Sequence, residues 1–353
     1  MKKLIIFLVL INYFGSKAQI AKYSNEFLAI GVGAHALGMS NSRVASVNDV
    51  TSGYFNPAGL ANLSQGIKTQ GALMHSEYFA GIAKYDYFGL ARRIDSSSVA
   101  SLNVIRLGVD DIPNTLDLID ANGQINYDRV KRFSAADYAF LLSYARKSKI
   151  EGLTFGGTAK IIRRTVGSFA NAWGFGIDAG IQYRKNGFRY GATLRDAFGT
   201  FNAWSMSFSE RETEVLLQTN NVVPKNSLEV TVPRLILGVA KNFEYKKFTA
   251  LAEVNLENTF DGYRNTLIKS KNLSIDPRVG VEFGYANTVF LRGGIGNIQE
   301  VKTGISSRAK IVQPNIGLGL KIKMIHLDYA FSNVGQQVGL LSHVFSLKVD
   351  LKK

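Results

Sequence analysis

The 353-residue sequence contains no cysteine, only 6 prolines, and no apolar run of the roughly eighteen residues that a transmembrane helix needs. The absence of cysteine excludes disulfides, thiol chemistry and a lipid-modified N-terminal cysteine. The absence of a long apolar run excludes a transmembrane helix. What the sequence has instead is 34 glycines, 22 phenylalanines and 15 tyrosines. This mixture favours many strands over helices.

The sequence also lacks the residue patterns of an enzyme. Its 4 histidines are scattered without metal-ligand spacing, and neither a G-x-S-x-G nucleophile motif nor a P-loop occurs. The glycines at 31, 33 and 38 do not have the spacing of a dinucleotide loop. Segment 120–128 resembles a calcium loop loosely, but Leu118 stands where an oxygen ligand is needed. We therefore expect no catalytic residue, no metal and no cofactor.

The first residues have the pattern of a secretory signal peptide. Lysines precede an apolar segment, 4–14, that is too short to span a bilayer as a helix. Small residues follow at Ser16 and Ala18, so we expect cleavage between Ala18 and Gln19. The precursor carries 42 basic and 27 acidic residues, a net charge of +15. Because the chain is exported, this excess suits an anionic outer-membrane surface or an acidic partner better than nucleic acid.

Residues 173–185 give the clearest strand pattern. Apolar residues from Trp173 to Tyr183 alternate with small or charged ones such as Gly176 and Asp178. The apolar face begins and ends in an aromatic residue over about ten residues, which is the length of a membrane-spanning strand. The same alternation recurs at 248–257, 279–285, 316–323 and 325–332.

Fourteen such segments can be counted within residues 64–353. They lie near 67–78, 81–93, 98–109, 133–147, 151–166, 173–185, 187–199, 229–243, 246–258, 273–285, 287–297, 309–323, 325–333 and 340–352. Connections after even-numbered segments are short, and those after odd-numbered ones are mostly long, apart from the first hairpin. Short periplasmic turns and long outer loops are typical of membrane barrels. The sequence therefore predicts an all-β fold, a fourteen-stranded antiparallel transmembrane β-barrel, over a soluble all-β protein.

Residues 19–63 lack the length and alternation of a wall strand. They predict an N-terminal helical plug inside the roomy barrel, with a short helix near 34–46. The plug ends in a rigid turn formed by Phe55, Asn56, Pro57, Ala58, Gly59 and Leu60. Proline fixes the direction of this turn and glycine permits a close approach, while Phe55 and Leu60 anchor it inside.

Charged residues collect on one face of the predicted strands. An arginine or lysine that faces lipid at mid-bilayer costs ~2–4 kcal/mol, so we place these charges in the lumen. The candidate lumenal ion-pair residues are Lys160, Arg164, Asp178, Arg184, Glu253, Glu282 and Lys321. Buried charges need partners, which favours a ladder of ion pairs between plug and wall; a polar pathway is the alternative.

Several segments resemble a known family. They comprise Gly33, Ala34, Leu37, Gly38, Met39, Val44, Ala45, Asp49, "FNPAGLA" at 55–61, "KIIRR" at 160–164 and "WGFGIDAGIQY" at 173–183. Together they resemble the PorV/PorQ family, which lies within the wider FadL-like outer-membrane barrels. Because the turn continues as NPAGL, the chain looks like a paralogue of PorV and PorQ. The resemblance implies an integral outer-membrane protein of a Gram-negative bacterium of the Bacteroidota.

The resemblance also implies a function. It points to a non-enzymatic barrel that docks other outer-membrane or surface proteins of a secretion or assembly machine, foremost the type IX secretion system. One alternative is an accessory subunit of the barrel-assembly complex. FadL relatives instead import hydrophobic compounds, so the other alternative is an importer with a lipid-like ligand. An importer needs an apolar pocket that reaches a gap in the wall, whereas a scaffold needs a sealed, ion-paired lumen.

Two outer segments are candidate interaction sites. Their residues are Asp110, Asp111 and Pro113 in the first, and Trp204, Met206 and Phe208 in the second. The first set indicates a break in the third strand, where FadL relatives open a lateral gate; an ordinary strand end fits equally. The second set lies in the expected loop 200–228 and offers apolar surface to a partner, or covers the barrel mouth.

Overall fold

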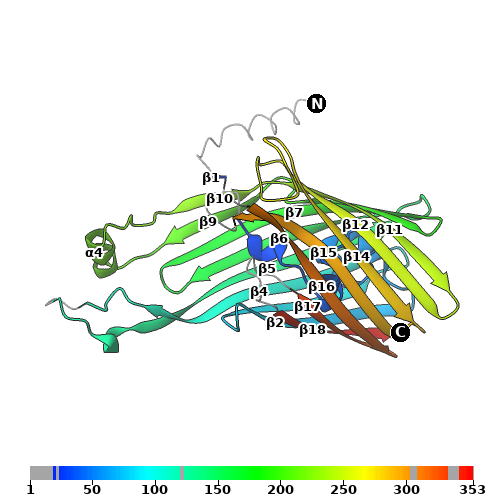
Figure 1. Ribbon diagram of the computed structural model, residues 1–353, viewed down its shortest axis with the longest axis horizontal. Coiled ribbons are helices and arrows are strands. Elements are labelled where there is room, and N and C mark those ends of the chain that lie inside the picture. The colour runs from blue at the N-terminus through cyan, green and yellow to red at the C-terminus, as the bar shows by residue number, and fades with distance from the viewer. Residues whose placement is uncertain (1–18, 21–23, 120–122, 303–307, 333–341, 353) are drawn as a thin grey trace.

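The computed structural model describes residues 19–20, 24–119, 123–302, 308–332 and 342–352. Its strands form one sheet that closes on itself (Figure 1), because β18 (Ser342–Lys352) pairs antiparallel with β2 (Ile67–Tyr78). The strands between them are β3 (Ala83–Arg93), β4 (Ser98–Asn114), β5 (Lys131–Lys147), β6 (Leu153–Val166), β7 (Ala170–Lys185), β8 (Phe188–Arg195), β9 (Thr200–Met206), β10 (Ser227–Thr231), β11 (Arg234–Tyr245), β12 (Phe248–Thr259), β14 (Ser274–Tyr285), β15 (Val289–Lys302), β16 (Arg308–Ile322) and β17 (Ile325–Ser332). Two-residue strands, β1 (Gln19–Ile20) and β13 (Ile268–Lys269), pair with β10 and β14. The expected signal peptide, 1–18, lies outside the described residues.

Two strands of the wall are interrupted. β8 and β9 both pair antiparallel with β7, while β11 pairs with β8 and β10 pairs with β9. β8 and β9 are therefore two parts of one wall strand, with a kink at 196–199. β10 and β11 are likewise two parts of the next wall strand, with a kink at 232–233. The wall then consists of fourteen antiparallel strands, which confirms the predicted fold class.

The seventh wall strand extends farther than the sequence indicates. The alternation predicts its end at 199 and a loop over 200–228, but β9 continues to Met206 and the connection spans only 207–226. Asp196 and Gly199 have φ values of 55° and 80°, so the chain bulges there and then resumes the ladder. The same residue types form turns, which is why the bulge resembles a strand end in the sequence.

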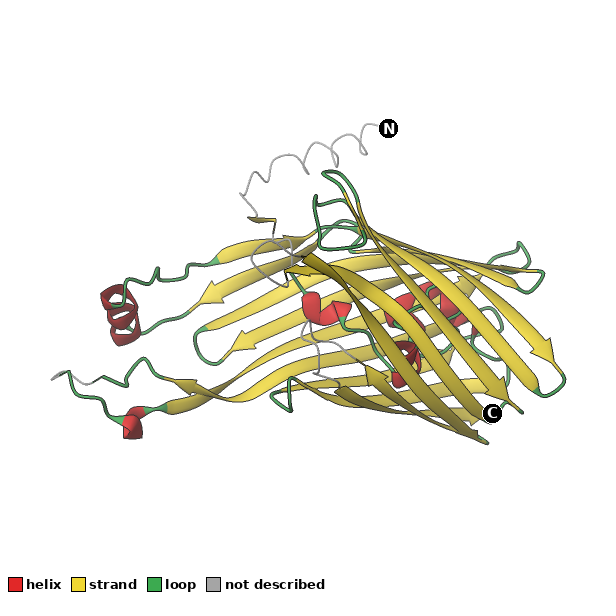
Figure 2. Cartoon of the chain, in the orientation of Figure 1, coloured by secondary structure: helices red, strands yellow, loops and turns green. Residues whose placement is uncertain are grey.

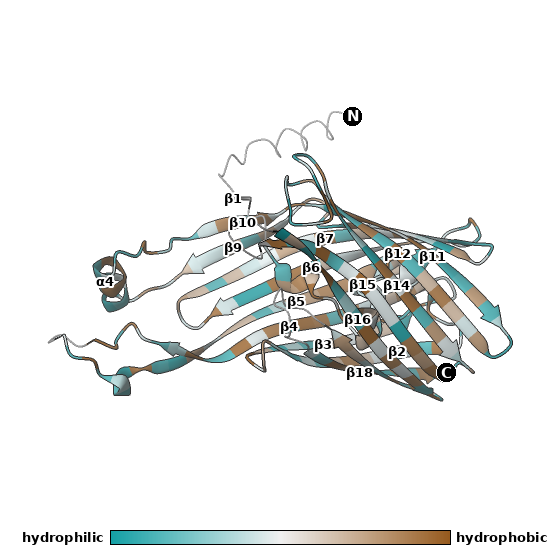
Figure 3. Ribbon diagram, in the orientation of Figure 1, coloured by the Kyte–Doolittle hydropathy of each residue, from teal (hydrophilic) through white to brown (hydrophobic). Residues whose placement is uncertain are grey.

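Side chains alternate across the wall. In β7, Trp173, Phe175 and Ile177 are 50%, 59% and 49% exposed on the outer surface. Asp178 and Gln182 of the same strand are buried on the inner surface. Figure 3 shows apolar residues recurring in this way along the strands of the wall. An apolar outer face and a polar inner face are what a lipid-embedded barrel requires. Among the described residues, no helix has the length and apolarity to cross a membrane.

A plug fills the barrel interior (Figure 2). It consists of η1 (Glu26–Ala29), α2 (Ala34–Gly38), α3 (Ser52–Phe55) and η2 (Pro57–Asn62). The helix predicted near 34–46 is shorter, because Ser40 and Asn41 adopt left-handed φ values of 52° and 61° just after α2. Apolar side chains of the plug and of β2–β6, with Ala330 of β17 and Val344 of β18, form one continuous core.

Elsewhere the plug lies directly against glycines of the wall. A Cβ atom added at Gly294 would lie 2.3 Å from the carbonyl carbon of Met39, and one at Gly180 would lie 2.1 Å from Asn56 Oδ1. Real Cβ atoms do not approach other atoms this closely, so glycine at these positions allows the plug to touch the wall. This contact explains the small residues on the inner face of the strands.

The strands β4, β5, β9 and β10 extend beyond the rest of the wall on the side of the long loops, to the left in Figure 1. η3 (Tyr127–Arg129) lies between β4 and β5, and α4 (Glu210–Gln218) lies between β9 and β10. A capping box at Ser209 begins α4. Arg211 of α4 lies 3.8 Å from Asp117, so an ion pair links the two extensions.

Candidate functional site

The turn at 55–60 ties the plug to the wall through one side chain. Asn56 Oδ1 accepts from the Ala58 N–H at 3.2 Å, which caps η2. The Asn56 amide donates to the carbonyl oxygens of Val44 at 2.9 Å and Ile181 at 3.0 Å. Pro57 follows at the first position of η2, where a backbone N–H would have no partner in the helix.

The other residues of this turn are close-packed. A Cβ atom added at Gly59 would lie 2.5 Å from the Val47 carbonyl oxygen, so the turn admits only glycine there. Phe55 and Leu60 are buried in the apolar core. The structure thus places all six residues of the motif inside the barrel.

Lys160 and Asp178 meet at the kink between β8 and β9. The Lys160 ammonium lies 2.7 Å from Asp178 and also pairs with Asp196, and all three side chains are buried. The sequence does not predict Asp196 in this cluster, because strand alternation would point it at lipid. Its left-handed φ turns the side chain inward instead. The sequence does carry a signal for this inward turn, since a charged residue at a position that alternation assigns to lipid is costly.

A second cluster joins the plug to the wall. Arg292 lies 2.6 Å from both Glu282 and Asp328, and His35 of α2 lies 3.0 Å from Glu282. Glu253 accepts hydrogen bonds from two backbone N–H groups of the plug, at 2.7 and 3.1 Å. These contacts anchor the plug to β12 and β14.

The plug histidine gives a pH-dependent prediction. Burial, with the nearby Arg292 and Arg43 guanidiniums, lowers the pKa of His35 from 6.5 to about 4. The unfolded chain therefore takes up this proton first as the pH falls, and the folded state loses about 2–3 kcal/mol between pH 7 and pH 4.5. We expect His35→Gln to remove this part of the pH dependence of urea unfolding. His75→Gln, on the outer face, is the control; an unchanged pH dependence in His35→Gln would contradict the prediction.

The remaining predicted lumenal residues have separate surroundings. Arg164 lies 2.8 Å from Asp137 and 3.7 Å from Glu229. Arg184 has two guanidinium nitrogens, Nε and Nη2, without a hydrogen-bond partner in the described part of the chain. Lys321 lines a chamber near the periplasmic turns. The seven candidates therefore belong to several clusters and not to one ladder.

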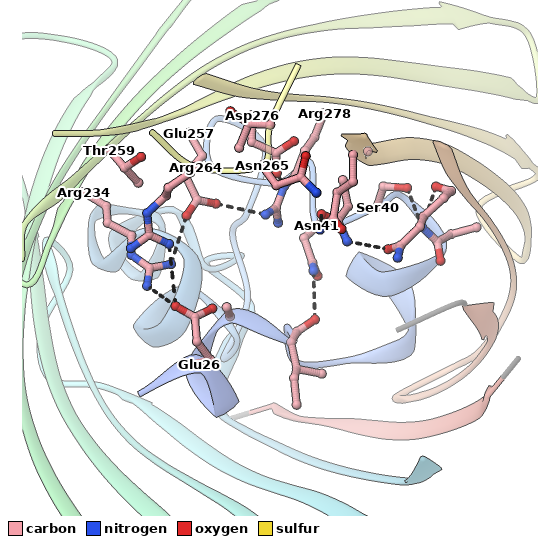
Figure 4. A pocket seen from close by; sticks show the side chains of 18 of the residues that line it. Glu26, Ser40, Asn41, Arg234, Glu257, Thr259, Arg264, Asn265, Asp276 and Arg278 are labelled. Carbon is pink, nitrogen blue, oxygen red and sulfur yellow. Dashed lines mark hydrogen bonds and ion pairs between the residues drawn. The ribbon is translucent and has the colours of Figure 1, made fainter. Parts of the chain in front are cut away.

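Two polar chambers lie on opposite sides of the plug. The outer chamber, of about 480 Å³, contains Arg234, which lies 2.7 Å from Glu26 and 3.2 Å from Glu257 (Figure 4). Arg278 lies 3.0 Å from the same Glu257. The inner chamber, of about 300 Å³, lies near the periplasmic turns and is also lined mainly by polar side chains. Arg234 and Arg278 are absent from the residues predicted from the sequence. The alternation of their strands does place both side chains in the lumen, and that was the signal that could have found them.

The apolar part of the lumen lies against β2–β4, and the plug fills it. Phe27 and Leu28 of η1 are buried in the same cluster as Tyr78 and Tyr85 of the wall. The Tyr85 hydroxyl donates to the Phe27 carbonyl at 3.2 Å, and Leu107 packs against the edge of the cluster. This region has the chemistry of an apolar ligand site, but plug side chains occupy it.

The third wall strand passes this region without a break. β4 continues to Asn114, and its register with β5 shifts by a bulge at 110–111, where Asp111 has a φ of 59°. The break predicted at Asp110, Asp111 and Pro113 is therefore a β-bulge in a continuous strand. Proline is accepted at 113 because the ladder with β3 ends at Val109, so its missing N–H leaves no partner unpaired.

The predicted partner-facing residues lie closer to the wall than expected. Trp204 and Met206 belong to β9, and only Phe208 lies in the connection that follows. The Arg164 guanidinium lies 5.0 Å from the centre of the Trp204 ring, and Phe208 stacks on Phe169 at 5.9 Å. These side chains pack on the strands at the barrel mouth.

The architecture of this barrel is similar to that of known proteins. No protein-family model and no curated protein matches the chain. Among solved structures, the P. putida toluene transporter TodX superposes with a TM-score of 0.56 at 13% identity, over 92% of this chain and 99% of TodX. The chain has the FadL-like barrel fold.

Two further FadL-like barrels support this assignment. A Pseudomonas aeruginosa FadL homologue has a TM-score of 0.54 at 11% identity, over 90% of this chain and 98% of its own. The CymD monoaromatic hydrocarbon channel has 0.54 at 12% identity, over 92% and 98%. TodX is named as a transporter and CymD as a channel, and the likeness to this chain is one of fold. The finer resemblance to PorV and PorQ stays a prediction.

Proposed function

We propose that this FadL-like barrel takes up small apolar molecules across the outer membrane and is closed by its plug in the present conformation. The observation that carries the proposal is the apolar, tyrosine-rich region against β2–β4, which Phe27 and Leu28 fill beside the bulge of the third strand. The fold neighbours support it, since they are named as a toluene transporter and a monoaromatic hydrocarbon channel.

The chemistry of this region defines the ligand class. Tyr78 and Tyr85 present rings with buried hydroxyls, and Ile105 and Leu107 add aliphatic surface. An apolar molecule of the size of one aromatic ring matches the volume that the Phe27 side chain takes up. Displacement of η1 by such a ligand exchanges one set of apolar contacts for another. It also breaks the ion pair of Glu26 with Arg234 and the hydrogen bond from Tyr85 to the Phe27 carbonyl, so the apolar contacts of the ligand have to offset these losses.

Filling this region tests the proposal. We expect Leu107→Trp to lower uptake of radiolabelled toluene by at least about fivefold in cells that express the chain, because the indole occupies the space a ligand needs. Leu102→Trp, which lies on the outer face of the same strand, is the matched control and should transport normally. Toluene uptake no faster than in cells without the chain would refute the proposal.

A specific observation favours a second candidate, a docking subunit of a secretion or assembly machine such as the type IX system. The plug is seated on wall glycines, and ion pairs of Glu26 with Arg234 and of Asp49 with Lys348 tie it to the wall. Both chambers are polar, as a sealed scaffold requires. Outer extensions also expose apolar side chains, including Tyr127, Leu217 and Val222.

Affinity purification of the tagged native protein separates the two candidates. Stoichiometric recovery of secretion components, or of barrel-assembly components, supports the docking function. Recovery of the barrel alone, with toluene uptake that Leu107→Trp lowers, supports uptake.

A further inference from the structure

Ionisable side chains interrupt the apolar outer face of the wall over β2–β4. His75 pairs with Asp86 in the register of β2 and β3, and Asp86 pairs with Arg106 in that of β3 and β4. His75 Nδ1 lies 2.7 Å from Asp86 Oδ1, and Arg106 Nη1 donates to Asp86 Oδ2 at 3.3 Å. The three side chains are 54%, 41% and 28% exposed on the outer surface. We call them the polar row.

The polar row lies closer to the periplasmic ends of its strands than the residue of β7 that stands in the same hydrogen-bonded row of the sheet. Asp86 is seven residues from Arg93, the periplasmic end of β3. Trp173, which the register places in the same row, is twelve residues from Lys185, the periplasmic end of β7. Five residues at ~3.4 Å on a strand tilted about 40° correspond to roughly 13 Å. Charges therefore interrupt the apolar wall of β2 and β3 at a lower level than Trp173 on β7, and the exposed Phe79 and Ile82 lie beyond them.

An apolar groove adjoins the polar row on the outer surface. It has a volume of about 910 Å³ and spans β15–β18 and β2–β4. Its outward side chains include Leu73, Phe88, Leu318, Leu327 and Phe345, which are between 41% and 58% exposed. The polar row lies at its margin. The volume is at the upper end of the range for small-molecule sites, about 300–1,000 Å³.

We propose that this groove binds a phospholipid, with the acyl chains on its apolar side chains and the phosphate at the polar row. The groove opens toward the bilayer, and its lining has no affinity for a polar solute. Arg106 donates to Tyr138 through Nε and to Asp86 through Nη1, and its guanidinium has further N–H groups that can donate to a phosphate oxygen. The row satisfies Asp86 internally, so no partner polypeptide is needed to pair it.

A head group held at the polar row lies deeper than the outer boundary of the membrane at β7. The bilayer is then thinner beside β2–β4 than around the rest of the wall, as lipids can thin locally next to a protein surface. This inference does not depend on the proposed uptake function.

Retention of lipid by the purified barrel tests the proposal. Wild-type protein in detergent is mixed with phosphatidylethanolamine, passed through gel filtration, and its bound phospholipid measured by mass spectrometry. We expect about one phospholipid per chain, a loss of at least about tenfold in Leu327→Trp, which fills the groove, and a several-fold loss in Arg106→Gln. Val279→Trp, outward on β14 and away from the groove, is the matched control and should retain lipid.

Two results would overturn the proposal. The first is that Leu327→Trp retains as much phospholipid as the wild type, or that the wild type itself retains none. The second is that a polypeptide copurifies with the wild type in stoichiometric amount and is lost in Leu327→Trp. The groove would then bind a protein. Heat-modifiable migration on gels reports that each variant forms a closed barrel.

Discussion

Gly294→Val is expected to force the plug out of its seat. The added Cβ would lie 2.3 Å from the Met39 carbonyl carbon and 2.6 Å from the Ser40 nitrogen. Both are backbone atoms and cannot rotate away, so plug or wall has to move. We expect a loss of at least about 3 kcal/mol in the free energy of unfolding and protease cleavage of the displaced plug. Urea denaturation and limited proteolysis measure the two effects.

The adjacent glycine is a matched control. Gly293 belongs to the same strand but faces outward, and a Cβ there meets nothing closer than Val281 Cγ2 at 3.8 Å. Gly293→Val should therefore leave stability and protease resistance close to those of the wild type. Equal effects of the two substitutions would show that strand propensity, and not the seat of the plug, decides the outcome.

Lys160→Met is the second substitution with a large expected effect. It leaves the carboxylates of Asp178 and Asp196 buried beside each other without the ammonium group that pairs with both. Removing one member of a buried ion pair costs about 3–5 kcal/mol, and here two like charges remain. We expect the midpoint of urea unfolding to fall accordingly, with the kink between β8 and β9 opening first in hydrogen exchange.

Two further variants make this result specific. Lys149→Met removes an exposed lysine from a periplasmic turn and should have little effect. A triple variant with apolar residues at 160, 178 and 196 should recover much of the lost stability, because no charge is then left unpaired. A triple variant no more stable than Lys160→Met would contradict the ion-pair explanation.

The wall was predictable because two independent signals agree. The alternation from Trp173 to Tyr183 sets which side chains face lipid, and the loop lengths set which ends of the strands face the periplasm. Both are local properties of the sequence. Boundaries such as 67–78 and 274–285 therefore lie within a residue or two of the predicted ones.

The site was less predictable because it depends on backbone conformations that alternation does not encode. The left-handed φ values of Asp111 and Asp196 turn an expected strand break and an expected strand end into bulges. Which lumenal charges meet depends on the stagger between distant strands, as for Arg292 with Asp328. The polar row escaped prediction for the opposite reason, since charges on the outer face break the rule that assigned charges to the lumen.

The seat of the plug also determines the order in which the chain can assemble. Gly38 in the plug touches Gly317 in β16, close to the far end of the sequence. A barrel that closed before the plug was in place would leave these glycines facing an empty lumen, and contacts between such distant segments form slowly. The apolar core shared with β2–β6 can hold the plug from the start. The plug, which precedes every long strand of the wall in the sequence, is thus the template on which the last strands close.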